Sequence, residues 1–299
     1  MTNEIQPSVS PGAPATPAAP AWRRHAVLVV KLAFMAGALW LVAHHLDLPA
    51  LASTLRHARP GWLVLAAALF IASKLISSLR LNRFFQAIDL HLSERYNLRL
   101  YWLGMYYNLF LPGGIGGDGY KVYLLGRQFP GRRKAIFRAL LLDRLSGMVA
   151  LLVLLLLLFA GTSYPGWWRA GALALVPLGL ALSYGLSRWL FGEFRAAFGR
   201  TSWQALGVQG AQVLCAWALL AALGAADGPV LPYLLVFLAS SVAAVLPLTV
   251  GGLGARELTF LYGAQLFALN APVAVSVSVL FYVITALVSL VGAFVRVEK

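Results

Sequence analysis

Long apolar runs alternate with short, arginine-rich polar segments along nearly the whole chain. A run of about 20 apolar residues is long enough to cross the hydrocarbon core of a bilayer as a helix. The first apolar run is longer than the apolar region of a typical signal peptide, which favours an uncleaved span there. The pattern predicts six full membrane spans, at about residues 26–46, 61–79, 139–160, 169–187, 203–223 and 272–295.

Two further apolar segments, at about 101–126 and 232–270, are interrupted by glycine and proline. The interruptions read L-P-G-G-I-G-G-D-G-Y-K over residues 111–121 and L-P-L-T-V-G-G-L-G-A-R over residues 246–256. A helix cannot continue through such a sequence, and broken backbone persists in hydrocarbon only where other groups satisfy it. Interruptions at matching places in two halves indicate the binding site of a transporter. Two unrelated glycine-rich loops are the less favoured alternative, because the spacing and the final basic residue both repeat.

The distribution of lysine and arginine predicts the topology. With a cytoplasmic N-terminus and both interrupted segments re-entrant, the outer loops carry only Arg56 and Arg59, and the other basic loops lie inside. Each half then reads span, span, re-entrant hairpin, span, as repeat A (26–160) and repeat B (169–295). Because each half has three full spans, the second is inverted relative to the first. The sequence therefore predicts an all-α polytopic membrane protein with inverted repeats and cytoplasmic termini.

Composition supports this class and bounds the domain organisation. The chain has 60% hydrophobic and 11% charged residues, whereas soluble domains average about 25% charged residues. Residues 1–21, rich in proline, alanine and serine, are expected to form a disordered cytoplasmic tail before a single transmembrane domain at 22–299. The net charge of +14 alone is compatible with nucleic-acid binding, but the basic residues sit between apolar spans, so no nucleic-acid partner is expected.

Candidate binding residues gather at the two interruptions. Where a broken helix restarts, its unpaired N–H groups and positive dipole end favour an anion such as the phosphate of a lipid head group. Lys121 and Arg256 lie one turn into the restarting helices and add positive charge. The candidates are Asn108, Pro112, Gly116, Gly117, Asp118 and Lys121 in the first segment, and Pro247, Gly251, Gly252, Gly254, Arg256 and Glu257 in the second.

Neighbouring charged residues leave alternatives open. Asp118 and Glu257 either pair with the adjacent basic residues or grip an ammonium group on the ligand. Asn108 is expected to cap carbonyl groups that the first break leaves unpaired. Asp143 and Arg144, two turns into the third span, are further candidates that would face a cavity or a charged partner, unless Arg144 reaches the interface.

Other polar groups in the sequence are weaker indicators of function. Lys74, near the end of the predicted span 61–79, is expected to extend its ammonium group to the interface rather than bind a ligand. Nucleotide-binding, zinc-protease and serine-hydrolase motifs are absent from the sequence. We therefore expect no enzyme, no cofactor and no metal.

These motifs resemble the transmembrane region of the lysylphosphatidylglycerol synthase family. The resemblance rests on Asn108 and residues 111–121, on Asp143, Arg144 and Gly147, and on residues 246–257. Family members commonly have arginine where this chain has Lys121. The synthases also carry a soluble aminoacyltransferase domain, so the resemblance implies the lipid-translocating part alone, without lipid aminoacylation. Relatives of this short form are thought to move or present phospholipids, lipid-linked sugars or hopanoid-type lipids.

The sequence and the resemblance together predict a flippase-like protein of a bacterial inner membrane. It would bind an anionic lipid or lipid-linked substrate between the two hairpins and carry it across the membrane. One alternative is a non-transporting partner that presents lipid-linked substrate to a membrane transferase. Another is a secondary carrier of a small soluble anion. The lipid, the direction of movement, the energy source and the oligomeric state stay open.

Overall fold

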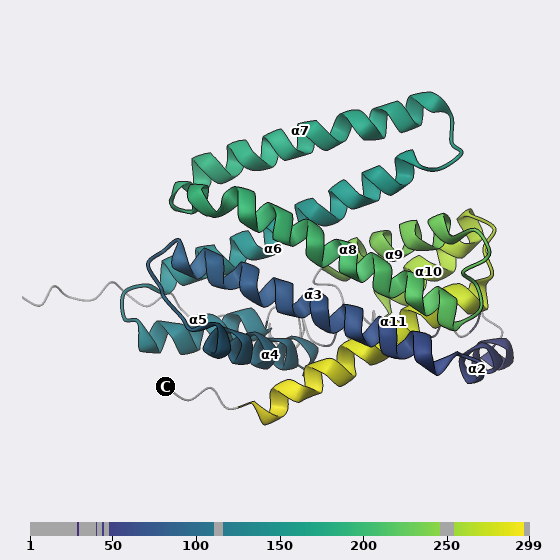
Figure 1. Ribbon diagram of the computed structural model, residues 1–299, viewed down its shortest axis with the longest axis horizontal. Helices are drawn as coiled ribbons and strands as arrows, with labels where there is room; N and C mark the ends of the chain where they lie inside the picture. Colours follow the sequence, from purple (N-terminus) through teal and green to yellow (C-terminus); the bar gives the residue numbers. More distant parts are fainter. Residues whose placement is uncertain are drawn as a thin grey trace, which may run out of the picture.

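The computed structural model describes residues 48–110, 116–245 and 254–295, together with Val29, Trp40 and His44. Every regular element in this part of the chain is a helix, as the ribbon shows (Figure 1). The α-helices are α2 (Leu48–Arg56), α3 (Pro60–Gln86), α4 (Glu94–Phe110), α5 (Gly116–Gln128), α6 (Arg133–Ala160), α7 (Gly166–Leu190), α8 (Phe198–Ala222), α9 (Val230–Val245), α10 (Ala255–Leu266) and α11 (Ala271–Leu290). Two 3₁₀-helices, η1 (Gly192–Ala197) and η2 (Val291–Phe294), precede α8 and follow α11.

Five helical segments are long and apolar enough to cross a membrane, namely α3, α6, α7, η1 with α8, and α11 with η2. They coincide with the second to sixth predicted spans, which confirms an all-helical, multi-pass membrane protein. The first predicted span (26–46) and the predicted tail (1–21) lie outside the described residues, apart from Val29, Trp40 and His44.

Helix α3 is longer than the sequence suggested, and this changes the place of Lys74. The predicted span ended at residue 79, but the helix continues to Gln86. Arg80 and Asn82 resemble loop residues, yet both are buried, and Arg80 is compensated by Asp143 of α6. Lys74 therefore lies near the middle of a 27-residue helix, and its predicted position near the end of a span is wrong.

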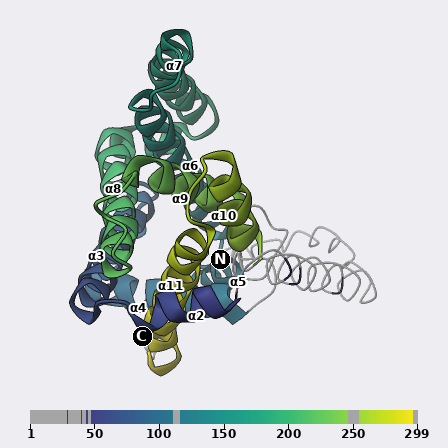
Figure 2. The same cartoon turned by 90° about the vertical axis from the view of Figure 1, so that its right-hand side faces the viewer.

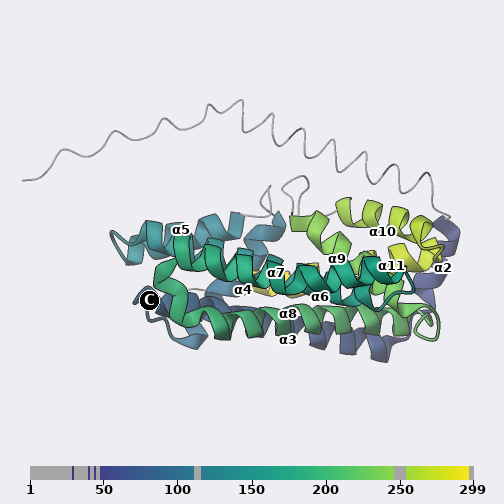
Figure 3. The same cartoon turned by 90° about the horizontal axis from the view of Figure 1, so that it is seen from above.

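Two pairs of shorter helices form antiparallel hairpins. We call α4 with α5 the first hairpin and α9 with α10 the second hairpin. They lie toward opposite ends of the long axis, along which α3, α6 and α8 run (Figures 1 and 3). Within the first hairpin, Gly117 lies against the backbone of Gly104, and within the second, Gly263 lies against Val236. These glycines allow the limbs to approach closely.

Helices α3 and α8 pack against each other along much of their length. The buried apolar residues form two clusters, one of which includes Phe70 of α3 and the other Phe84 of α3. Around α3 and α8, the limb α9 of the second hairpin packs on α6, and the limb α4 of the first hairpin packs on α11 and η2. Trp102 of α4 donates a hydrogen bond to the carbonyl of Val288 (3.1 Å), and Gly292 lies against the Trp102 backbone. We call this arrangement the cross-packing. Helix α7 stands at the edge of the bundle beside α6 (Figure 2).

Charge is segregated between the two ends of the bundle. At one end, which we call the basic end, α3 leads into α4, α5 into α6 and α7 into α8 (Figure 1). The other end holds the turns from α2 to α3, α6 to α7, α8 to α9 and α10 to α11, whose connecting residues include two charged side chains, Arg59 and Asp227. The basic residues at or near the basic end include Arg83, Arg95, Arg99, Arg127, Arg132, Arg133, Lys134, Arg138, Arg188, Arg195 and Arg200.

Candidate functional site

Asp118 is the centre of the charge cluster of the first hairpin. Its Oδ1 lies 3.3 Å from the Nζ of Lys121, one turn further along α5. Its Oδ2 accepts a 2.6 Å hydrogen bond from the Nη2 of Arg144, which links α5 to α6. Lys121 is buried, and its ammonium also lies 4.9 Å from the centroid of the Tyr101 ring. The Asp118 carboxylate therefore compensates Lys121 and Arg144 directly.

Asn108 connects the two limbs of the first hairpin. Its side-chain oxygen accepts a 2.8 Å hydrogen bond from the backbone N–H of Gly117, in the first turn of α5. Asn108 is predicted to cap carbonyl groups, but in this bond its side chain is the acceptor and satisfies one of the amides left unpaired at a helix start. Gly116 begins α5, and the close approach at Gly117 is to the Gly104 carbonyl, which a Cβ at Gly117 would meet at 1.9 Å.

Asp143 lies beside this cluster and has a different partner. Its Oδ1 accepts a 2.7 Å hydrogen bond from the Nε of Arg80, and both side chains are largely buried. Gly147, one turn further along α6, lies beside the Arg80 guanidinium, and its carbonyl accepts a hydrogen bond from Gln209 of α8. The pair therefore joins α3 to α6 where α8 also packs.

Glu257 stabilises the start of α10 rather than forming an ion pair with Arg256. Gly254 precedes the helix with φ of +87°, a backbone conformation that favours glycine. The Glu257 carboxylate accepts hydrogen bonds from the Gly254 N–H (2.7 Å) and from the Ser278 hydroxyl (2.9 Å). This is the backbone-directed half of a capping box, in which an acidic residue in the first turn reaches back to the amide before the helix.

Arg256 forms no ion pair with a carboxylate of the described residues. Its guanidinium lies 4.8 Å from the centroid of the Phe281 ring, and its Nη1 is buried with no hydrogen-bond partner in the described part of the chain. Lys121 occupies the corresponding place in the first motif and is paired with Asp118. The two motifs therefore differ: the first is electrostatically compensated, and the second holds a buried donor that has no hydrogen-bond partner among the described residues.

Lys74 is a polar group outside the set of candidate residues predicted from the sequence. Its Nζ lies 4.5 Å from the centroid of the Phe70 ring, one turn back along α3. It makes no ion pair with any described residue, and the charges of Arg256 and Arg80 both act on it. A sequence signal existed, because a span extended through Arg80 and Arg83 would have placed Lys74 near its centre.

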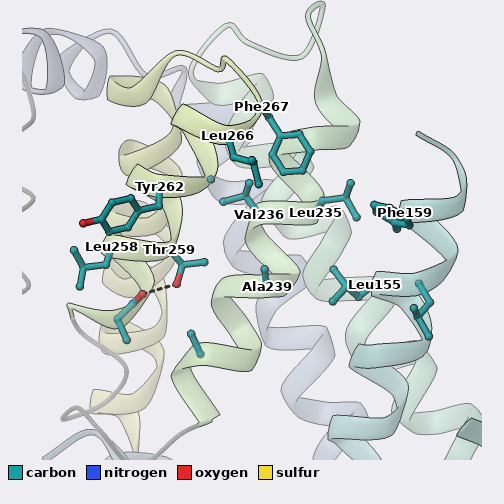
Figure 4. A pocket seen from close by; sticks show the side chains of 14 residues that line it. Leu155, Phe159, Leu235, Val236, Ala239, Leu258, Thr259, Tyr262, Leu266 and Phe267 are labelled. Atoms are coloured by element: carbon teal, nitrogen blue, oxygen red, sulfur yellow. Dashed lines mark hydrogen bonds between the residues drawn. The ribbon is translucent and has the colours of Figure 1, made fainter. Parts of the chain in front are cut away.

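An apolar groove lies between α6 and the second hairpin (Figure 4). Its volume is about 820 Å³. Tyr262 and Leu266 of α10 line it and are more than half exposed, so the groove reaches the lateral surface of the bundle. The hydroxyl of Thr259 donates to the Ala255 carbonyl at 2.7 Å, so this polar group in the lining is already satisfied. Other lining residues include Leu155, Phe159, Leu235, Val236, Ala239, Ala255, Leu258 and Phe267.

A comparison with known families identifies the chain. The family model for the lysylphosphatidylglycerol synthase TM region matches residues 28–292. The chain belongs to this family. No curated protein matches it significantly. The family match spans both hairpins, the groove and every candidate residue, and together with the membrane helices it identifies a membrane protein related to lipid handling.

Some candidates of this family member lie beyond the described residues. Pro112, Pro247, Gly251 and Gly252 fall in the segments 111–115 and 246–253, so their roles stay predictions. Across the described ranges, no group of three or more His, Cys, Asp or Glu side chains is arranged to hold a metal ion.

Proposed function

We propose that the protein binds an anionic lipid, or a lipid-linked substrate with an anionic group, and moves it across the membrane. The observation that carries this proposal is the first turn of α10. Ala255 lines the apolar groove, while the next residue, Arg256, has a buried nitrogen with no partner among the described residues. Hydrocarbon and an anion are thus accommodated at adjacent positions of one helix, which is the chemistry of a lipid.

The groove favours a lipid over a small soluble anion. The groove of about 820 Å³ has an apolar lining without charged side chains, so it has no groups that would bind a hydrated ion. Each buried CH₂ group of an acyl or prenyl chain contributes about 0.8 kcal/mol. The groove also reaches the lateral surface at Tyr262 and Leu266, from which a chain in the bilayer can enter without crossing water.

The proposed transport cycle rests on inverted repeats with re-entrant hairpins. The packing supports it: α3 with α4 corresponds to α8 with α9, α5 with α6 to α10 with α11, and α11 with α4 to α6 with α9. Helix α5 has 13 residues and α10 has 12, and neither reaches the roughly 30 Å of a hydrocarbon core at about 1.5 Å per residue. The two halves would rock about the hairpins, with Lys121 and Arg256 alternately facing the head group.

We propose that the basic end faces the cytoplasm of a bacterial inner membrane and that both termini lie on that side. The supporting observation is the concentration of arginine at this end, since cytoplasmic loops carry an excess of lysine and arginine. A cysteine-accessibility experiment with single cysteines at Lys134 and Asp227, in a Cys215→Ala background, tests the orientation. Labelling of position 134 from the periplasm would contradict it.

Lipid movement is tested in proteoliposomes. The liposomes contain fluorescent phosphatidylglycerol, and a membrane-impermeant reductant bleaches the fluorophores in the outer leaflet. The fraction of fluorescent lipid that the reductant can reach is followed over time. The protein should accelerate exchange between leaflets, and Arg256→Gln should slow it about tenfold or more through loss of a charge-assisted contact. Arg188→Gln, which removes an exposed arginine at the end of α7, is the matched control.

The outcomes separate the candidate functions. Exchange no faster than in protein-free liposomes would contradict transport. Lipid that is retained on the purified protein but never exchanged would favour presentation to a membrane transferase. Uptake of soluble anion without lipid exchange would favour the small-anion carrier.

A further inference from the structure

Lys74 and Arg256 belong to one row of side chains that crosses from α3 to α10. The Lys74 ammonium lies 4.5 Å from the Phe70 ring centroid, and the Phe70 and Phe281 centroids are 5.5 Å apart in an edge-to-face arrangement. The Arg256 guanidinium lies 4.8 Å from the Phe281 centroid. Two cations therefore flank one aromatic pair inside the bundle. Contact with a ring face offsets only part of the cost of burying a cation.

The carboxylates within the described membrane helices are already engaged. Asp118 is bound by Lys121 and Arg144, and Asp143 is bound by Arg80. Glu257 accepts from the Gly254 amide and the Ser278 hydroxyl. Throughout residues 48–110, 116–245 and 254–295, neither Lys74 nor Arg256 forms an ion pair.

Lys74 lies near the middle of α3, far from both ends of the helix. It lies 12 residues before the end of α3 and 14 residues after its start. At about 1.5 Å per residue, these separations are roughly 18 and 21 Å, more than a lysine side chain can span. Ionisable residues within membrane-spanning helices often mark substrate or ion pathways.

We propose that Lys74 and Arg256 together bind a phosphate group that carries two negative charges, as a phosphomonoester or a diphosphate does. A phosphomonoester carries about −1.5 to −2 near pH 7, whereas a phosphodiester carries a single charge. Two cations that form no ion pair among the described residues match the former. The planar guanidinium supplies paired donors to phosphate oxygens and the ammonium acts as a point charge. The assignment of this group to a lipid rests on the proposed function; the site itself does not.

The binding test uses purified protein in nanodiscs of zwitterionic lipid, titrated with phosphatidic acid, with phosphatidylglycerol and with inorganic pyrophosphate. Bound lipid is counted by native mass spectrometry. Phosphatidic acid should bind about tenfold or more tightly than phosphatidylglycerol, because it offers a second charge to the second cation. Lys74→Met and Arg256→Gln should each remove this preference. Lys134→Gln and Arg188→Gln, which remove exposed charges at the basic end, should leave it unchanged.

A stability measurement separates ligand binding from a structural role for Lys74. Replacing a partly buried cation that has no ion-pair partner with an apolar side chain of similar length removes a desolvation cost, so Lys74→Met should unfold at the same or a higher temperature than wild type. Loss of phosphatidic acid binding with retained stability supports the proposal. Retained preference for phosphatidic acid in Lys74→Met, or loss of binding together with a lower unfolding temperature, overturns it.

The arms of the experiment also separate this site from the lipid function. Pyrophosphate binding that depends on Lys74 and Arg256, without retention of phosphatidic acid, supports the site and removes the lipid from the proposed function. Retention of phosphatidic acid that is insensitive to both substitutions overturns the site and leaves lipid handling standing.

Discussion

Asp118 of α5 and Arg144 of α6 are joined by a 2.6 Å contact between Oδ2 and Nη2. The other carboxylate oxygen of Asp118 faces Lys121 at 3.3 Å, so one acidic group holds two cations. The contact links α5, the second helix of the first hairpin, to the membrane-spanning helix α6. The Asp118 carboxylate therefore compensates the positive charges of Lys121 and Arg144 in the first motif.

Removing this carboxylate should destabilise the protein. Asp118→Asn leaves Lys121 and Arg144 without their counterion, and breaking a largely buried pair on one side costs about 3 kcal/mol of unfolding free energy. Glu193→Gln is the control, because its 3.0 Å pair with Arg138 is exposed and worth under about 1 kcal/mol. Thermal unfolding in detergent, followed by fluorescence-detected size exclusion, compares the two. Equal shifts in the unfolding temperature would contradict the bridging role of Asp118.

Two glycines of α5 should respond oppositely to alanine. A Cβ at Gly117 would lie 1.9 Å from the Gly104 carbonyl oxygen, so Gly117→Ala must push the limbs of the first hairpin apart. Gly119 has open space around its Cβ position, and Gly119→Ala should gain up to about 1 kcal/mol of helix propensity. The same unfolding assay measures both. A neutral Gly117→Ala would show that the hairpin limbs are not held at this separation.

The helix start at Glu257 should be sensitive to its carboxylate. Glu257→Ala removes the acceptor for the Gly254 amide and the Ser278 hydroxyl, and should lower the unfolding free energy by about 2 kcal/mol. Ser278→Ala removes only one of these bonds and should cost about half as much. If the two variants unfold at the same temperature, the backbone capping by Glu257 contributes nothing.

Filling the groove should impair lipid movement selectively. Ala239 of α9 lies in the groove, and Ala239→Phe would occupy the space proposed for a hydrocarbon chain (Figure 4). Lipid exchange in proteoliposomes should slow several-fold, while pyrophosphate binding stays unchanged. Ala181→Phe, on the exposed surface of α7, adds the same ring outside the groove. Exchange at the wild-type rate in Ala239→Phe would exclude the groove from the pathway.

Local features of the sequence predicted the class of the protein and most of its helices. Span length and hydropathy are properties of contiguous residues, so five spans appear where the apolar runs indicated. Glycine and proline likewise marked both interruptions. The end of α3 was missed because the burial of Arg80 depends on Asp143, 63 residues further along the chain.

The charge partners at the site were harder to predict for the same reason. Asp118 and Glu257 hold similar positions in the two motifs, and the sequence left pairing with the adjacent cation open for both. In the structure the two carboxylates have different partners. Asp118 accepts hydrogen bonds from Arg144 and Lys121. Glu257 accepts hydrogen bonds from the Gly254 amide and the Ser278 hydroxyl. Ser278 lies 21 residues beyond Glu257, and no local pattern specifies that contact.

The cross-packing has a consequence for biogenesis. Helix α4 packs against α11 and η2, which are the last helices of the described chain to leave the ribosome. During translation, the first hairpin is therefore synthesised long before its packing partner exists. Co-expression of the two halves as separate polypeptides should restore the hairpin, whereas the N-terminal half alone should be degraded.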